Sequence, residues 1–140
     1  MCGIIGIQNN SEAAMLAYMG LYAQQHRGQE GAGVVSSDGV HLYRHMGQGL
    51  VSDVFSDSDV FDGLFGESAI GHVRYSTTGN SDKKNVGPLT FNMGDHYLSI
   101  AHNGNLVNIE DVRLDLQKEG ALFQTSTDTE IIIHLIAREK

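Results

Sequence analysis

The sequence predicts an α+β domain, and three observations support this prediction. Apolar runs of strand length are separated by polar turns, the pair Asp38-Gly39 is typical of a β-hairpin, and capping patterns precede segments of helical spacing. A chain of 140 residues, 41% hydrophobic and 19% charged, is long enough for one domain with its own core.

The apolar runs predict β-strands at residues 3–7, 32–37, 40–43, 69–75 and 97–102, with residues 47–51 as an extension of the sheet. The turn Ser37-Asp38-Gly39 separates two of these runs, so the two strands are expected to pair as a tight hairpin. The glycine-rich stretch Gln24–Gly33, considered alone, is interpreted as a solvated turn.

The first predicted helix lies between these strands. Asn9 is expected to be its N-cap, with Glu12 three residues later, and Gly28 is expected to end it. Helical spacing predicts that its buried face holds Leu16, Met19 and Ala23.

Two further helices are predicted in the last third of the chain. The first has Asn108 as its cap, ends at Gly120, and carries an apolar face of Ile109, Val112 and Leu116. The second opens with the capping box Thr127–Glu130 and continues as the apolar stretch 131–137. Because this helix reaches Lys140 without a glycine or proline stop, we expect the sequence to be a piece of a longer protein.

Composition argues against several classes of function. The net charge of −8, with no basic run, argues against a nucleic-acid partner. No apolar stretch approaches the roughly 20 residues of a membrane span, so no membrane partner is expected. A single cysteine excludes an internal disulfide and a cysteine-rich metal site, and favours the cytoplasm. The aspartates of residues 52–62 are interpreted as a solvated acidic turn, because their spacing does not match a calcium loop.

The functional interpretation depends on Cys2, which directly follows the initiator methionine. Removal of Met1 would leave a thiol and a free α-amine on one residue, with pKa values of about 8.5 and about 7.7–8.0. Such a residue can be nucleophile and general base at once. The alternative is a small apolar residue of no special role, and position alone does not decide between the two.

Other polar positions also have two interpretations. Arg74 at a strand end is either part of a surface ion pair or a bidentate partner for a carboxylate, and His72 is interpreted as a core histidine. Asn103-Gly104 is either a turn or a pair of donors for an oxyanion. Asp128, considered alone, is explained by the dipole of the helix that it opens.

The start of the chain, Met1-Cys2-Gly3-Ile4-Ile5-Gly6, resembles that of class II glutamine amidotransferases, which are N-terminal nucleophile hydrolases. Four further stretches are similar to one family in that group, the amidophosphoribosyltransferases of purine synthesis: Gln25–Glu30, Gly49–Phe55, Gly71–Gly79 and Ala101–Leu106. The resemblance implies an αββα sandwich of antiparallel sheets flanked by helices, incomplete at its C-terminus within residues 1–140.

The resemblance also implies catalytic roles. Cys2 would attack the side-chain amide of L-glutamine, form a thioester and release ammonia, with its own α-amine as the proton acceptor and donor. Asn103 and Gly104 would stabilise the oxyanion, and Arg27 would lie over the nucleophile and orient its terminus. No metal or other cofactor is implied for this step.

Substrate-binding roles follow from the same resemblance. Arg74 would bind the α-carboxylate of glutamine and Asp128 its α-ammonium group, with help from Thr77. Gly28 would lie beside Arg27 over the nucleophile. The opposite charges of Arg74 and Asp128 would select an amino acid over a simple amide.

For the whole enzyme, the resemblance implies that a phosphoribosyltransferase domain is absent from residues 1–140. In the full-length protein, expected to be a homo-oligomer, ammonia would pass to phosphoribosyl pyrophosphate, and Mg²⁺ is expected in the missing domain. The 140-residue chain alone is expected to show weak or no glutaminase activity.

Two alternatives stay open. The chain could belong to another class II amidotransferase, one that makes amino sugars or asparagine. It could also be a non-catalytic remnant that binds glutamine through Arg74 and Asp128 without turnover. A papain-like cysteine protease is disfavoured, because Cys2 does not begin a helix and no separate histidine–asparagine relay is apparent.

Overall fold

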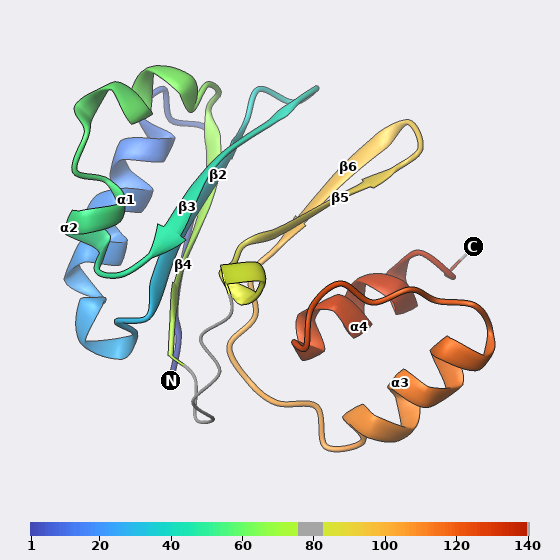
Figure 1. Cartoon of the computed structure of the whole chain (residues 1–140). Helices are drawn as coiled ribbons and strands as arrows, with labels where there is room; N and C mark the ends of the chain where they lie inside the picture. Colours follow the sequence, from blue (N-terminus) through green and yellow to red (C-terminus); the bar gives the residue numbers. More distant parts are fainter. Residues whose placement is uncertain (76–82, 140) are drawn as a thin grey trace. The chain divides into compact units, whose positions relative to one another are not determined.

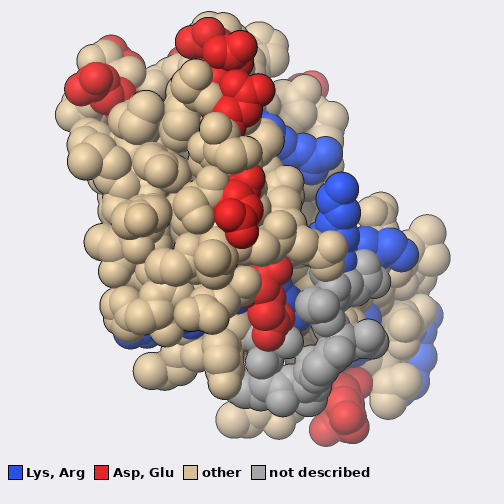
Figure 2. Space-filling view, turned by 60° about the vertical axis from the view of Figure 1, so that its left-hand side comes forward, with Lys and Arg blue, Asp and Glu red and all other residues tan. Residues whose placement is uncertain are grey.

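The structure is a computed structural model, and it describes residues 1–75 and 83–139 (Figure 1). The chain divides into two compact units, Met1–Asn103 and Gly104–Lys140, each of which is described by itself. Among the described residues, no helix has the length and apolar character needed to cross a membrane. The face turned forward in Figure 2 carries acidic side chains in several separate places, in keeping with the net charge of −8.

The first unit contains a four-stranded antiparallel sheet in the order β1-β4-β2-β3. Its strands are β1 (Gly3–Ile7), β4 (Ser68–Arg74), β2 (Gly31–Ser37) and β3 (Leu42–Gln48). The register pairs Gly3 of β1 with Val73 of β4, and Gly31 of β2 with Arg74. Cys2, the residue before β1, therefore lies next to the end of β4.

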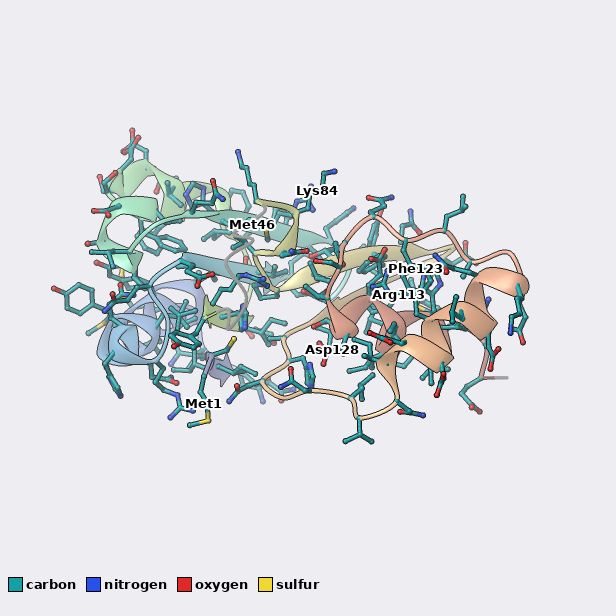
Figure 3. All side chains as sticks on the ribbon, turned by 60° about the horizontal axis from the view of Figure 1, so that its bottom comes forward. Met1, Met46, Lys84, Arg113, Phe123 and Asp128 are labelled. Carbon is teal, nitrogen blue, oxygen red and sulfur yellow. The ribbon has the colours of Figure 1, made fainter. Side chains whose placement is uncertain are left out.

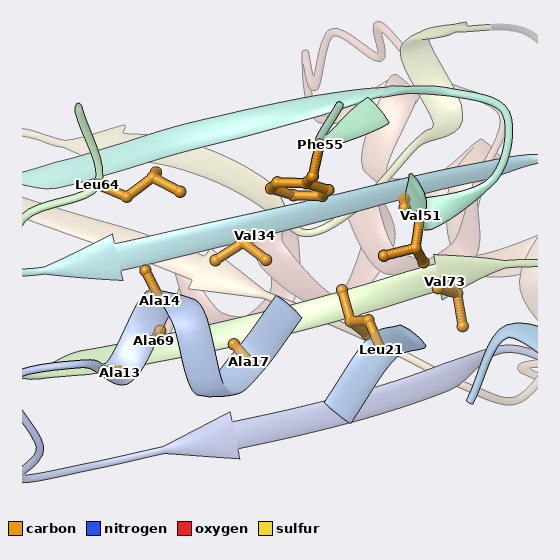
Figure 4. Close-up of a cluster of buried hydrophobic side chains, with 11 residues drawn as sticks. Ala13, Ala14, Ala17, Leu21, Val34, Val51, Phe55, Leu64, Ala69 and Val73 are labelled. Atoms are coloured by element: carbon orange, nitrogen blue, oxygen red, sulfur yellow. The ribbon is translucent and has the colours of Figure 1, made fainter. Parts of the chain in front are cut away.

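Helices α1 (Ala13–Ala23) and α2 (Val51–Val54) cover one face of this sheet (Figure 1). Together with β2, β4 and the loops after α2, they form the hydrophobic core, whose buried members are Ala13, Ala14, Ala17, Leu21, Ala32, Val34, Val51, Phe55, Leu64, Ala69 and Val73 (Figure 4). A Cβ atom on Gly71 of β4 would lie 2.9 Å from the Leu21 side chain, so α1 packs closely on the sheet at this glycine. Because side chains alternate along a strand, His72 and Arg74 face the opposite side from Val73.

The remaining elements of the first unit are short. The described residues of this unit include the 3₁₀ turns η1 (Gln25–Arg27), η2 (Ser58–Gly63) and η3 (Lys83–Asn85). The strands β5 (Leu89–Met93) and β6 (His96–Ile100) form a separate antiparallel hairpin.

The second unit contains α3 (Ile109–Lys118) and α4 (Asp128–Ile136). At the end of α3, Gly120 has a φ of 92°, the N–H of Ala121 donates to the carbonyl of Leu116 at 2.9 Å, and that of Gly120 donates to Gln117 at 3.0 Å. This is a Schellman motif, in which glycine adopts the left-handed conformation at low cost. The predicted stop at Gly120 is thereby confirmed.

The α+β class is confirmed, and the strands predicted at residues 3–7 and 69–75 match β1 and β4 within one residue. The hairpin of β2 and β3 is also confirmed, but it is not tight: Ser37 pairs with Leu42, so four residues form the turn. The strand extension over residues 47–51 is wrong beyond Gln48, because Val51 begins α2 and is buried in the core.

The prediction for the first helix is wrong at both ends and in its buried face. Asn9 is not the N-cap: it has a φ of 57°, and the Asn10 side chain instead accepts a hydrogen bond from the Glu12 N–H at 2.8 Å. The helix ends at Ala23, before Gly28, and η1 follows it. Met19 is 57% exposed, whereas Leu21 is fully buried. The face of α1 that carries Leu21 is the one that packs against the sheet, at Gly71.

Candidate active site

Cys2 is held by backbone groups on two sides. The N–H of Tyr75 donates to Cys2 Sγ at 3.4 Å, and the thiol lies 3.6 Å from the Tyr75 carbonyl oxygen as a donor to it. Arg27 Nε donates to the Cys2 carbonyl oxygen at 3.1 Å. The residue is therefore fixed at its sulfur and at its carbonyl, while Met1 before it is 74% exposed.

The segment that contains Arg27 and Gly28 is packed against the end of β4. A Cβ atom on Gly28, which is buried, would lie 2.6 Å from the backbone carbon and oxygen of Arg74. The Gln25 side chain donates to the Gly28 carbonyl and accepts from the N–H of Val51, both at 2.6 Å. The interpretation of residues 24–33 as a solvated turn is therefore wrong, because this stretch contains η1 and the buried start of β2.

Arg74 is not a surface ion pair. Its side chain is 15% exposed, and its Nη1 donates to the carbonyl of Asn85 at 2.8 Å. Its Nε lies 3.9 Å from Oε2 of Glu30, whose own N–H donates to the Arg74 carbonyl at 3.2 Å. The guanidinium is thus oriented by groups from η3 and from the segment before β2.

His72 lies two residues before Arg74 on β4. It is a core histidine as predicted, with 5% of its surface exposed. Burial lowers its pKa to about 4, and the positive charge of Arg74 adds to this shift, while the backbone of His102 opposes it. The imidazole is therefore neutral at pH 7.

The second unit holds Asp128 at the start of α4. Its Oδ2 accepts a hydrogen bond from the N–H of Leu106 at 3.1 Å, which ties the helix to the segment just after Asn103 and Gly104. Asn103 is exposed and ends the first unit, and Gly104 begins the second. Thr77 lies outside the described residues.

The structure therefore brings together Cys2, Arg27, Gly28 and Arg74 in the first unit, and it fixes Asp128 in the second. Sequence reasoning missed the contribution of Tyr75, which acts through its backbone and leaves no side-chain pattern to read. Gln25 and Glu30 lie within the stretch Gln25–Glu30 that resembles the family. Their contacts, of Gln25 with Gly28 and of Glu30 with Arg74, could be found only in the folded chain. Among the described residues, no group of three or more His, Cys, Asp or Glu side chains could hold a metal ion.

Comparison with known proteins shows the family of the chain. The family described as "Glutamine amidotransferase domain" matches residues 58–139, so the chain carries such a domain. The amidophosphoribosyltransferase of Lacticaseibacillus casei is 46% identical over 138 residues, which cover 99% of this chain and 71% of the relative. That of Staphylococcus aureus strain MRSA252 is 50% identical over 140 residues, which cover 99% of this chain and 28% of the relative.

A solved structure described as "structure of the allosteric regulatory enzyme of purine biosynthesis" has a TM-score of 0.93 and 46% identity, and it covers 99% of this chain and 30% of that one. The chain belongs to the amidophosphoribosyltransferase family, whose members are transferases. It spans less than a third of the Staphylococcus relative and of the solved structure. Family membership favours purine synthesis over the amino-sugar and asparagine alternatives.

Proposed function

We propose that this chain is the glutaminase portion of an amidophosphoribosyltransferase. It would hydrolyse glutamine at Cys2 and supply ammonia to phosphoribosyl pyrophosphate, which gives 5-phosphoribosylamine in the first committed step of de novo purine biosynthesis. The observation that carries the proposal is the position of Cys2. Its sulfur accepts a hydrogen bond from the N–H of Tyr75, the residue that follows Arg74 at the end of β4.

The chemistry follows from a free Cys2 terminus after removal of Met1. The α-amine takes the thiol proton, and the sulfur attacks the Cδ carbonyl of glutamine. The Asn103 amide and the Gly104 N–H would donate to the oxyanion, where the loss of one such donor typically costs about 10²–10³ in rate. The ammonium then gives its proton to the leaving nitrogen, the C–N bond breaks, and ammonia departs from a thioester.

Hydrolysis completes the cycle. Water loses a proton to the α-amine and attacks the thioester carbonyl, the C–S bond breaks, and the sulfur recovers the proton as glutamate leaves. Arg27, which donates to the Cys2 carbonyl, would hold this residue in place through both steps.

Arg74 would bind the α-carboxylate of glutamine and Asp128 its α-ammonium group, with help from Thr77. Gly28 would lie with Arg27 over the nucleophile. The support for Arg74 is its orientation: the side chain is 15% exposed and held at Nη1 by the Asn85 carbonyl. A guanidinium that is already oriented loses little entropy when it binds a carboxylate bidentately.

The other parts of the proposal concern the complete protein. We assign the expected Mg²⁺ to the phosphoribosyltransferase domain of the complete protein. We also propose a homo-oligomer in the cytoplasm, where a reducing environment would keep Cys2 as a thiol. Residues 1–140 alone are expected to have weak or no glutaminase activity.

Glutamate release and 5-phosphoribosylamine formation test the proposal in the complete natural protein. We expect Cys2→Ala to abolish glutamate release and glutamine-dependent product formation, while formation from added ammonia persists. Glutamate release within tenfold of the natural rate in Cys2→Ala would refute the proposal. Binding of glutamine without turnover by the natural protein would instead support the non-catalytic alternative.

A further inference from the structure

Glu130 is a buried carboxylate that the proposed reaction does not use. It is 1% exposed and lies in the first turn of α4. Its two oxygens accept hydrogen bonds from the N–H of Gln124 at 2.9 Å, and from the N–H and the hydroxyl of Thr125, both at 2.7 Å. The expected capping box is therefore wrong in detail, because Glu130 binds the loop before the helix and the Thr127 side chain makes no capping bond.

Arg113 of α3 holds the carbonyl groups of the same loop. Its Nη1 and Nη2 donate to the Thr125 carbonyl, each at 3.2 Å, and Nη2 also donates to the Thr127 carbonyl at 3.3 Å. Its guanidinium carbon lies 4.1 Å from the centre of the Phe123 ring, and Figure 3 shows these two side chains next to each other. A carboxylate thus fixes the N–H groups of the loop and a guanidinium fixes its carbonyls.

The loop that Glu130 and Arg113 hold is followed directly by Asp128, which comes after the N-cap Thr127 and is labelled in Figure 3. Residues two positions apart on a helix point to nearly opposite sides. Anchoring Glu130 in the interior therefore sets the rotation of α4 about its axis and directs Asp128 to the other side. There the Asp128 carboxylate meets the Leu106 N–H.

We propose that Glu130 and Arg113 are positioning residues that aim the Asp128 carboxylate at the α-ammonium group of glutamine, and so determine selectivity for a substrate with a free amine. The inference rests on the proposed function, specifically on the role of Asp128 in binding that group. Hydrogen bonds made to an ionised carboxylate or guanidinium are strong and directional, which suits both residues to fix a short loop.

The test compares glutamine with its analogue that lacks the α-amine, 5-amino-5-oxopentanoic acid, in the complete natural protein. Selectivity is the ratio of the two kcat/KM values for hydrolysis. We expect Glu130→Gln to lower this ratio about tenfold, mainly through a higher KM for glutamine, because a neutral amide holds the loop N–H groups less firmly. Arg113→Lys keeps the positive charge but loses the planar set of guanidinium donors, so it should also lower the ratio.

Asp115→Asn is the matched control, since it removes an exposed carboxylate of the same unit that contacts Lys118 at 2.8 Å. The control should leave the ratio unchanged. Asp128→Asn should itself abolish most of the selectivity, and adding Glu130→Gln to it should cause no further loss, as expected for residues that act through one group.

The results distinguish the role of Asp128 from the positioning role of Glu130 and Arg113. If Asp128→Asn keeps full selectivity, the proposed role of Asp128 fails and this inference fails with it. If Asp128→Asn loses selectivity while Glu130→Gln and Arg113→Lys keep it, or impair both substrates equally, only the positioning role is overturned. Should Glu130→Gln fail to fold, the selectivity of Arg113→Lys decides.

Discussion

The sulfur of Cys2 and the guanidinium of Arg74 are both oriented by backbone groups. The Tyr75 N–H donates to the sulfur and the Asn85 carbonyl accepts from the guanidinium. Cysteine, arginine and glycine at these positions could be proposed from the sequence, because they lie in stretches that resemble the family. The sequence could not predict their partners, since a backbone donor is the same for every residue type.

His72 predicts a pH dependence of stability. Its pKa is about 4 in the folded chain and about 6.5 when unfolded, so the unfolded state binds more protons between these values. The free energy of unfolding should therefore fall as pH decreases from about 6.5 to about 4, by a total on the order of 3 kcal/mol. Denaturant titrations at several pH values measure this fall.

His72→Gln should flatten that slope, and His96→Gln, which changes an exposed ring in β6, should preserve it. An unchanged slope in His72→Gln would show that other groups cause the pH dependence.

Gly28→Ala tests the close packing over β4. The new Cβ would lie 2.6 Å from the Arg74 backbone, so the segment must shift, at a cost of about 1–3 kcal/mol. We also expect glutamate release to fall, because Arg27 next to it anchors Cys2. Gly6→Ala is the control, since no heavy atom lies within 4 Å of its added Cβ. Equal stability of the two variants in denaturant would contradict this packing.

At the level of elements, helical spacing did not predict which face of α1 is buried. Leu16, Met19 and Ala23 satisfy helical spacing, yet the face against the sheet is that of Ala17 and Leu21. Both faces are apolar, and the buried face is the one with Leu21, which packs closely on Gly71 of β4. The starts of α3 and α4 were predicted better, since Asn108 and Thr127 are the N-cap residues although neither side chain makes a capping bond. The end of α3 was also predicted, because Gly120 acts locally.

Leu21→Ala and Met19→Ala measure which face is buried. Leu21 is fully buried, so its truncation should leave a cavity and cost about 2–5 kcal/mol. Met19 is 57% exposed, and its truncation should change the free energy of unfolding by about 0.5 kcal/mol or less. The reverse order of these two losses in chemical denaturation would contradict the structure of α1.

At the scale of the whole molecule, the chain combines a sheet unit with Cys2 and Arg74 and a helical unit with Asp128. The α+β class and the family could be predicted, because five motifs that resemble the family occur in order over the chain. The strand order β1-β4-β2-β3 could not, since pairing between distant strands leaves no local pattern.

The central claim is that a free N-terminal Cys2 is the nucleophile for glutamine. The most direct measurement is mass spectrometry of the complete natural protein after treatment with a diazoketone analogue of glutamine. We predict a chain without Met1 that gains one adduct, located at Cys2 by peptide mapping and suppressed by excess glutamine. An adduct at another residue, or full labelling of a chain that keeps Met1, would contradict the account.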